Sequence, residues 1–115
     1  MVYTTTGTFL SLIGQADDAM NKQEVIDVIR KNGPLIRERF GVDRLGLFGS
    51  YVRERQRKES DIDILVSFAR DIDLFDFVEL REFLESRLHH KVDLVMETAL
   101  KPTIKKRILD EVEYV

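Results

Sequence analysis

The sequence predicts an α/β protein of the α+β type, in which a small mixed β-sheet carries helices packed on one face. Three observations lead to this fold class. Helical and strand periodicities follow one another in the order helix, strand, strand, helix, strand, helix. Each expected helix has a single apolar stripe to bury. The most regular strand alternates between apolar and polar residues, so the second sheet face is expected to stay open.

The first half of the chain is expected to form two helical pieces and a strand. Asn21 is a suitable N-cap, and the helical stripe that follows it is interrupted at Gly33-Pro34 before it resumes as far as Gly41. Residues 44–48 are a short apolar run that ends at Gly49. Such a run is typical of a buried strand.

The second half is expected to form a strand, a helix, a third strand and a last helix, in that order. Residues 61–68 alternate regularly, residues 74–88 return to a helical period, and residues 91–96 form a third strand. An acidic run is expected to cap the middle helix: Asp71, Asp73 and Asp76. The last helix begins near Lys101, and its apolar stripe consists of Ile104, Ile108, Leu109 and Val112.

Composition limits the classes of function that are open to the chain. The 115 residues, 43% of them hydrophobic, fill one domain, which we place at residues 21–115 after an N-terminal arm at residues 1–20. Because there is no cysteine, thiolate catalysis and a sulfur-based zinc site are excluded, and a cytoplasmic location is expected. No apolar run is long enough to span a membrane. The net charge of −3 argues against direct binding of nucleic acid by the whole surface.

Two carboxylates stand two residues apart in the second strand, at Asp61 and Asp63. They therefore point to the same side, roughly 6 to 7 Å apart at the backbone. Asp93 is expected on another strand of the same open face. Carboxylates placed in this way can hold Mg²⁺, and three of them can hold two ions for an in-line displacement at phosphorus. The alternative is a solvated strand face or a pair of turn-capping side chains.

Gly49 and Ser50 directly follow an apolar strand and open a short helix. Backbone N–H groups in such a position can hold phosphate, and the guanidinium of Arg53 can bind two phosphate oxygens. The alternatives are an ordinary turn at Gly49-Ser50 and a solvated charged loop around Arg53. His89-His90 does not predict a metal site, because adjacent side chains at a helix end point in different directions.

Together these segments resemble the nucleotidyltransferase superfamily that includes DNA polymerase beta. The resemblance is carried by Phe48-Gly49-Ser50-Tyr51-Val52-Arg53, by the ten residues that separate Ser50 from Asp61-Ile62-Asp63, and by Lys91-Val92-Asp93-Leu94-Val95. More narrowly, the small size and the segment from Leu100-Lys101-Pro102 to Tyr114-Val115 resemble the minimal nucleotidyltransferase antitoxins. Glu54 departs from the pattern, since relatives commonly carry glycine after the arginine.

The resemblance implies a nucleotidyltransferase fold and a role for each site residue. Gly49 and Ser50 would hold the nucleoside triphosphate, Asp61 and Asp63 would bind Mg²⁺, and Asp93 would be the third carboxylate, close to the attacking hydroxyl. It further implies magnesium-dependent transfer of AMP from ATP to a tyrosine of a HEPN-type RNase toxin, which is how such antitoxins silence their partner. Two alternatives stay open: a non-catalytic module that neutralises the toxin by occlusion, and nucleotidyl transfer to a small molecule or an RNA end.

Overall fold

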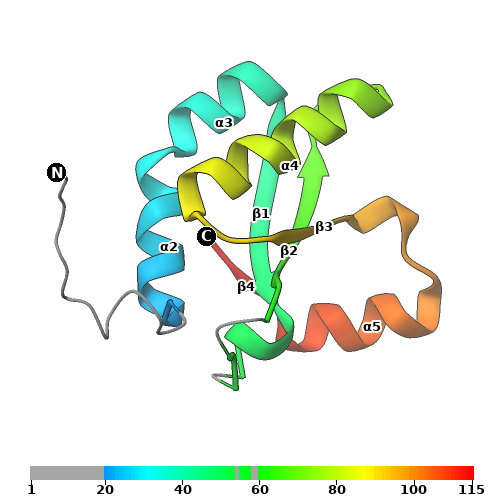
Figure 1. Cartoon of the computed structure of the whole chain (residues 1–115). Helices are drawn as coiled ribbons and strands as arrows, with labels where there is room; N and C mark the ends of the chain where they lie inside the picture. Colours follow the sequence, from blue (N-terminus) through cyan, green and yellow to red (C-terminus); the bar gives the residue numbers. More distant parts are fainter. Residues whose placement is uncertain (1–19, 54, 58–59) are drawn as a thin grey trace, which may run out of the picture.

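The computed structural model describes residues 20–53, 55–57 and 60–115, and within them it confirms the predicted order of elements (Figure 1). Nearly all of the expected N-terminal arm lies outside the described residues. A short strand at the end of the chain is an addition to the predicted order. The elements are α2 (Lys22–Lys31), α3 (Gly33–Phe40), β1 (Val42–Phe48), the 3₁₀ helix η2 (Gly49–Tyr51), β2 (Ile62–Phe68), α4 (Leu74–Leu88), β3 (Val92–Met96), the 3₁₀ helix η3 (Glu97–Ala99), α5 (Pro102–Glu111) and β4 (Glu113–Tyr114).

The four strands form one mixed sheet in the order β3-β2-β1-β4. β1 runs antiparallel to both β2 and β4, whereas β2 and β3 are parallel. β1 begins two residues earlier than predicted, and the register shifts between Val42 and Arg44. In the register, Asp63 of β2 lies opposite Phe48 of β1 and opposite Asp93 of β3, so the sheet itself brings two of the predicted acids together.

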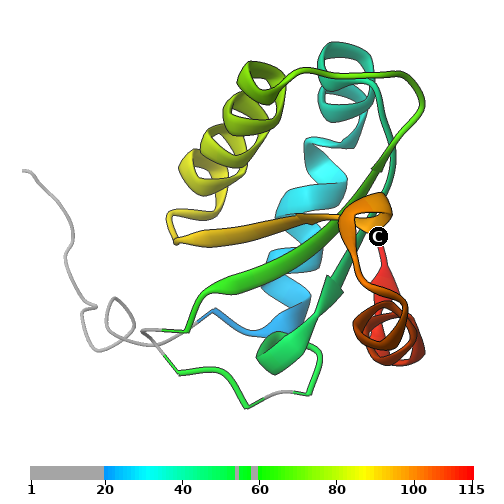
Figure 2. The same cartoon turned by 90° about the vertical axis from the view of Figure 1, so that its right-hand side faces the viewer.

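Helices α2, α3 and α4 pack together on one face of the sheet (Figures 1 and 2). Two of the predicted capping residues, Asn21 and Asp73, cap their helices. Asn21 and Glu24 form a reciprocal capping box on α2, and Asp73 accepts a 2.8 Å hydrogen bond from the Asp76 N–H at the start of α4. His89 ends α4 in the left-handed conformation, at φ 51°. These helices bury their predicted stripes against the sheet through Val25, Ile29, Ile36, Phe40, Leu80, Leu84 and Leu88.

The last helix departs from the expected packing. In α5, all of which the structure describes, no residue is buried, and Ile104 of the predicted apolar stripe is 45% exposed. Val112 follows the helix instead of belonging to it, and a Cβ atom at Gly46 would lie only 2.5 Å from its Cγ2 atom. Gly46 pairs with Leu65, which is 1% exposed. Val112 therefore covers part of the sheet face that was expected to be open, before β4 joins the edge of the sheet, and α5 lies on the side away from α4 (Figure 2).

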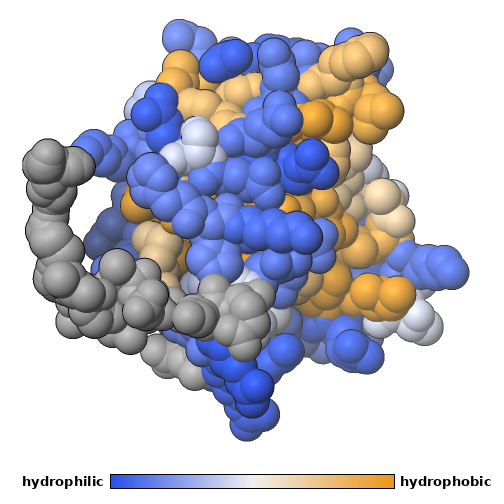
Figure 3. Space-filling model, in the orientation of Figure 1, coloured by the Kyte–Doolittle hydropathy of each residue, from blue (hydrophilic) through white to orange (hydrophobic). Residues whose placement is uncertain are grey.

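Apolar side chains are also exposed at the start of α4, where Leu74 and Phe75 are 72% and 82% exposed. Apolar surface gathers on that side of the molecule, whereas charged and polar residues cover most of the remaining view (Figure 3). Among the described residues, no helix is long and apolar enough to cross a membrane.

Candidate active site

The centre of the site is a pair of carboxylates, Asp63 on β2 and Asp93 on β3. Because the two residues are partners in the parallel register, their side chains leave the same face of the sheet and share a hydrogen bond. The pKa of Asp63 is raised from 3.8 to about 6, first by burial and then by the charge of Asp93, the hydrogen bond with Asp93 and the charge of Asp61, whereas the charge of Arg53 lowers it. Such a perturbed acid in a cleft is typical of a functional site.

Asp61 lies one residue before β2 and is half-buried. Its charge reaches Asp63, as the raised pKa of Asp63 shows. Within the described ranges, however, no three Asp, Glu or His side chains are gathered closely enough to hold a metal ion. The structure thus brings Asp63 and Asp93 together and leaves Asp61 at the edge of the pair.

Asp63 and Asp93 fit a hard divalent cation. Both offer oxygen donors, and their shared hydrogen bond requires a proton, because two ionised carboxylates in contact repel each other. A cation would remove the need for that proton. Mg²⁺ commonly uses only one or two protein carboxylates and completes its shell with water and substrate phosphates, so a pair is sufficient.

Gly49 is required at its position for two reasons. Its φ angle is +76°, a conformation that residues with a Cβ atom rarely adopt. A Cβ atom at Gly49 would also overlap the Asp63 carboxylate. Glycine therefore lets the loop after β1 approach the acids of β2 closely. The loop then turns compactly, because the Ser50 carbonyl accepts a 2.9 Å hydrogen bond from the Arg55 N–H.

Arg53 belongs to this loop. Its backbone N–H donates a 3.2 Å hydrogen bond to the Gly49 carbonyl, which holds the backbone of Arg53 close to the glycine. Its guanidinium is 2.9 Å from Oε1 of Glu111 in α5, and its positive charge reaches Asp63. Gly49, Asp63 and Arg53 therefore surround one space.

That space is a cleft of about 250 Å³ between the sheet and α5. Phe48, Gly49, Arg53 and Asp63 line one wall, and α5 supplies the other through Ile104, Arg107, Ile108 and Glu111. The part played by α5 was not predicted. The available signal was its spacing, because residues 104 and 108 and residues 107 and 111 are i, i+4 pairs that share a helix face. Nothing in that spacing says which partner the face meets.

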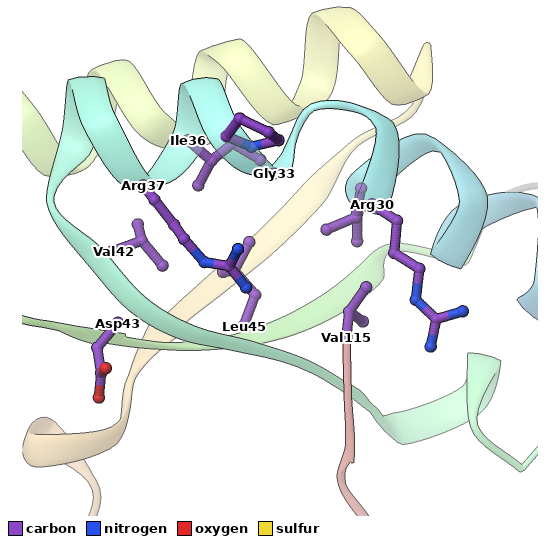
Figure 4. Close-up of a pocket in the computed structure, with 10 residues that line it drawn as sticks. Arg30, Gly33, Ile36, Arg37, Val42, Asp43, Leu45 and Val115 are labelled. Atoms are coloured by element: carbon purple, nitrogen blue, oxygen red, sulfur yellow. The ribbon is translucent and has the colours of Figure 1, made fainter.

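A second cavity of about 250 Å³ lies between α2, α3 and β1 (Figure 4). Arg37 reaches over it from α3, and its apolar lining includes Ile36, Val42 and Leu45. None of the six predicted site residues lines it. Asp43 is the only acid among the described residues that line it, so the cleft beside Gly49 and Asp63 is the better candidate for chemistry.

Known proteins resemble this chain over the same region. The nucleotidyltransferase domain family matches residues 29–115. Protein adenylyltransferase MntA of Thermococcus cleftensis is 46% identical over 93 residues, which cover 81% of this chain and 94% of that protein. A solved minimal nucleotidyltransferase matches with a TM-score of 0.70 and 33% identity, over 82% of this chain and 95% of its own. In a solved complex of a tri-AMPylated Shewanella oneidensis HEPN toxin with MNT antitoxin, the match has a TM-score of 0.53 and 28% identity, over 82% and 67% of the two chains.

Proposed function

Because the chain belongs to the nucleotidyltransferase domain family and is an enzyme of that class, we propose that it transfers AMP from ATP to a tyrosine hydroxyl of a HEPN-type RNase toxin. It would thereby act as the antitoxin of a toxin–antitoxin pair, in the cytoplasm. The observation that carries this proposal is the close approach of Gly49 to the Asp63 carboxylate, which leaves no room for a Cβ atom, beside Asp93 and Arg53. The relatives support the acceptor class, since one is a protein adenylyltransferase and another accompanies an AMPylated toxin.

In this proposal the loop side of the cleft binds the phosphates of ATP. The Gly49 N–H and the Arg53 guanidinium are donors at the cleft. Ser50 follows Gly49 in the chain without lining the cleft, and we propose that its hydroxyl is a further donor to the phosphates. The acids lie on the sheet side, where Asp63 lines the same space. The α-phosphorus would lie between these two walls, because both must act on the same nucleotide.

The transfer forms a bond between the acceptor oxygen and the α-phosphorus of ATP, and it breaks the bond between that phosphorus and the oxygen bridging to the β-phosphorus. Pyrophosphate leaves with the bonding electron pair, and the proton of the acceptor hydroxyl passes to a carboxylate. We assign that acceptance to Asp93, which is exposed and adjacent to Asp63. An exposed carboxylate can meet a hydroxyl from a second protein.

Asp63 and Asp93 would hold Mg²⁺, with Asp61 as the carboxylate for a second ion. When bound there, magnesium supplies charge neutralisation for the triphosphate and lowers the pKa of the attacking hydroxyl. Asp63 contributes to this by its position: it is held by β1 and β3 on its two sides and cannot withdraw from the pair.

The test is intact-mass spectrometry of a HEPN-type protein, taken from the same organism as this chain, after incubation with ATP and Mg²⁺. We expect the wild-type protein to add one or more AMP units to it. The Asp61→Asn, Asp63→Asn double variant should add none. A matched control is Asp43→Asn, Asp110→Asn, which removes the same charge from two exposed positions away from the acids and should retain transfer.

Two outcomes would contradict the proposal. If the double variant at Asp61 and Asp63 modified the toxin as the wild type does, the acids would not carry the chemistry. If neither protein added AMP while both inhibited the RNase equally, the chain would be an occluding module.

A further inference from the structure

Glu111, at the end of α5, occupies the donors that the proposed function assigns to phosphate. Its Oε2 atom accepts a 2.7 Å hydrogen bond from the Gly49 N–H, and its Oε1 atom accepts one of 2.9 Å from Nη1 of Arg53. The Glu111 side chain is 27% exposed, whereas that of Arg53 is 53% exposed. One carboxylate thus satisfies both groups at the mouth of the cleft.

A carboxylate and a phosphoryl group are equivalent acceptors for these donors, since both present oxygens that carry negative charge. The single Gly49 N–H cannot donate well to both at once. Two like charges within the same cleft would also repel each other. Glu111 and a triphosphate therefore exclude one another from this position.

We propose that Glu111 is an internal competitor of the nucleotide, which fills the phosphate-binding donors of the free protein and leaves them when the triphosphate enters. The inference rests on the proposed function only in that the cleft binds a nucleoside triphosphate. It adds that the affinity for the nucleotide is lowered by the cost of displacing Glu111.

The attachment of α5 makes this displacement feasible. The structure describes every residue of α5, and none of them is buried. Its N-cap residue, Lys101, makes no side-chain capping bond. Moving the helix or turning the Glu111 side chain therefore costs little apolar contact. Arg107 lies one turn before Glu111 and lines the same cleft, so a cation of α5 stays available to a bound triphosphate.

A different role for Glu111 makes the opposite prediction. If it only orients Arg53 for phosphate, its removal should leave Arg53 less ordered and weaken nucleotide binding. If it competes, its removal should strengthen binding. The direction of the change therefore separates a competitor from a positioning residue.

The experiment is calorimetric titration of the whole chain with ATP and, separately, with inorganic tripolyphosphate, both with Mg²⁺. For Glu111→Gln we expect roughly 5- to 30-fold tighter binding of both probes, as the loss of one charge-assisted hydrogen bond to the competitor implies. Glu111→Ala should give at least the same gain, because it also removes the remaining acceptor. The matched control is Asp110→Asn, which removes the same charge from an exposed neighbour on the same helix and should change binding less than twofold.

Thermal unfolding of each variant checks that α5 and the sheet stay folded. Unchanged or weaker binding of both probes by Glu111→Gln and Glu111→Ala would overturn the inference. So would a lack of binding by every variant, since the vacated donors would then not accept phosphate. AMP transfer is measured in a separate assay. If Glu111→Gln bound tripolyphosphate more tightly but the toxin was not modified, the competition by Glu111 would be supported and the toxin would be ruled out as the acceptor.

Discussion

β2 and α5 each contribute a carboxylate to the same cleft, but they are attached to the molecule in different ways. Four of the seven residues of β2 are buried, and the strand is paired with β1 on one side and β3 on the other. α5 has no buried residue; its Glu111 bonds Gly49 of η2 and Arg53, and the short strand β4 that follows it pairs with β1. Asp63 is thus fixed by the core, whereas Glu111 is held by bonds that a ligand can replace.

This difference separates the two tasks of the site. A group that acts on the reacting atoms must be kept in place, because small misplacements are costly in rate. A group that yields to substrate needs an element with little burial, because such elements open at low cost. The buried strand supplies the first kind of group and the surface helix the second.

The largest effect that we expect is on stability, from truncating an equivalent apolar residue in each region. Ile64 of β2 is fully buried, so Ile64→Ala should lower the free energy of unfolding by about 2 to 5 kcal/mol. Ile104 of α5 is 45% exposed, so Ile104→Ala should cost less than about 1 kcal/mol. Urea unfolding monitored by circular dichroism measures both. Equal costs would mean that α5 is as firmly held as the strand.

A second test concerns the close approach of the loop to β2. Gly49→Ala places a Cβ atom against the Asp63 carboxylate at a φ of +76°, so it should cost about 1 to 3 kcal/mol and also impair AMP transfer. Gly33→Ala is the matched control, because no described atom lies within 4 Å of its added Cβ and alanine favours the helix. Urea unfolding and the transfer rate are measured for both. Full stability and activity in Gly49→Ala would show that Gly49 need not approach Asp63.

The smallest effect is the dependence of stability on pH. Because the pKa of Asp63 rises from 3.8 unfolded to about 6 folded, the folded state binds more protons between these values, and stability falls as the pH rises through this window. After allowance for partial exposure, we expect a loss of about 1 kcal/mol.

Asp63→Asn should remove this loss, and Asp110→Asn should not. Urea unfolding from pH 4 to pH 6.5, without divalent cations, gives the difference between each variant and the wild type. If the free energy of unfolding changed with pH in the same way for Asp63→Asn and the wild type, the fold would not disfavour the charged form of the Asp63 carboxylate.

The core, and the side of β2 on which Asp61 and Asp63 lie, could be predicted because their signals are local. Alternation over residues 61–68 places Asp61 and Asp63 opposite the buried Ile62 and Ile64, and the structure keeps that alternation. Asn21 and Asp73 were predictable as caps, since a cap bonds within three residues of itself. The fold class, the mixed sheet and the family followed from these segments and are confirmed.

The role of α5 could not be predicted in this way. The bond between the Gly49 N–H and Glu111 joins residues 62 positions apart, and no periodicity encodes such a contact. An apolar stripe on a helix predicts burial, and the stripe of α5 stays largely exposed. Leu65 was expected on an open face and is buried, because alternation does not reveal that Val112 packs against Gly46, the β1 partner of Leu65.

We expect the acids fixed on the sheet to carry out the transfer. The most direct measurement is the single-turnover rate of AMP transfer to the HEPN-type toxin by Asp63→Asn, compared with the wild type and with Asp110→Asn under the same conditions. We expect the rate of Asp63→Asn to fall by at least about 100-fold with the fold intact, and that of Asp110→Asn to stay within about twofold. A rate for Asp63→Asn close to that of the wild type would show that the Asp63 carboxylate is not needed for the transfer.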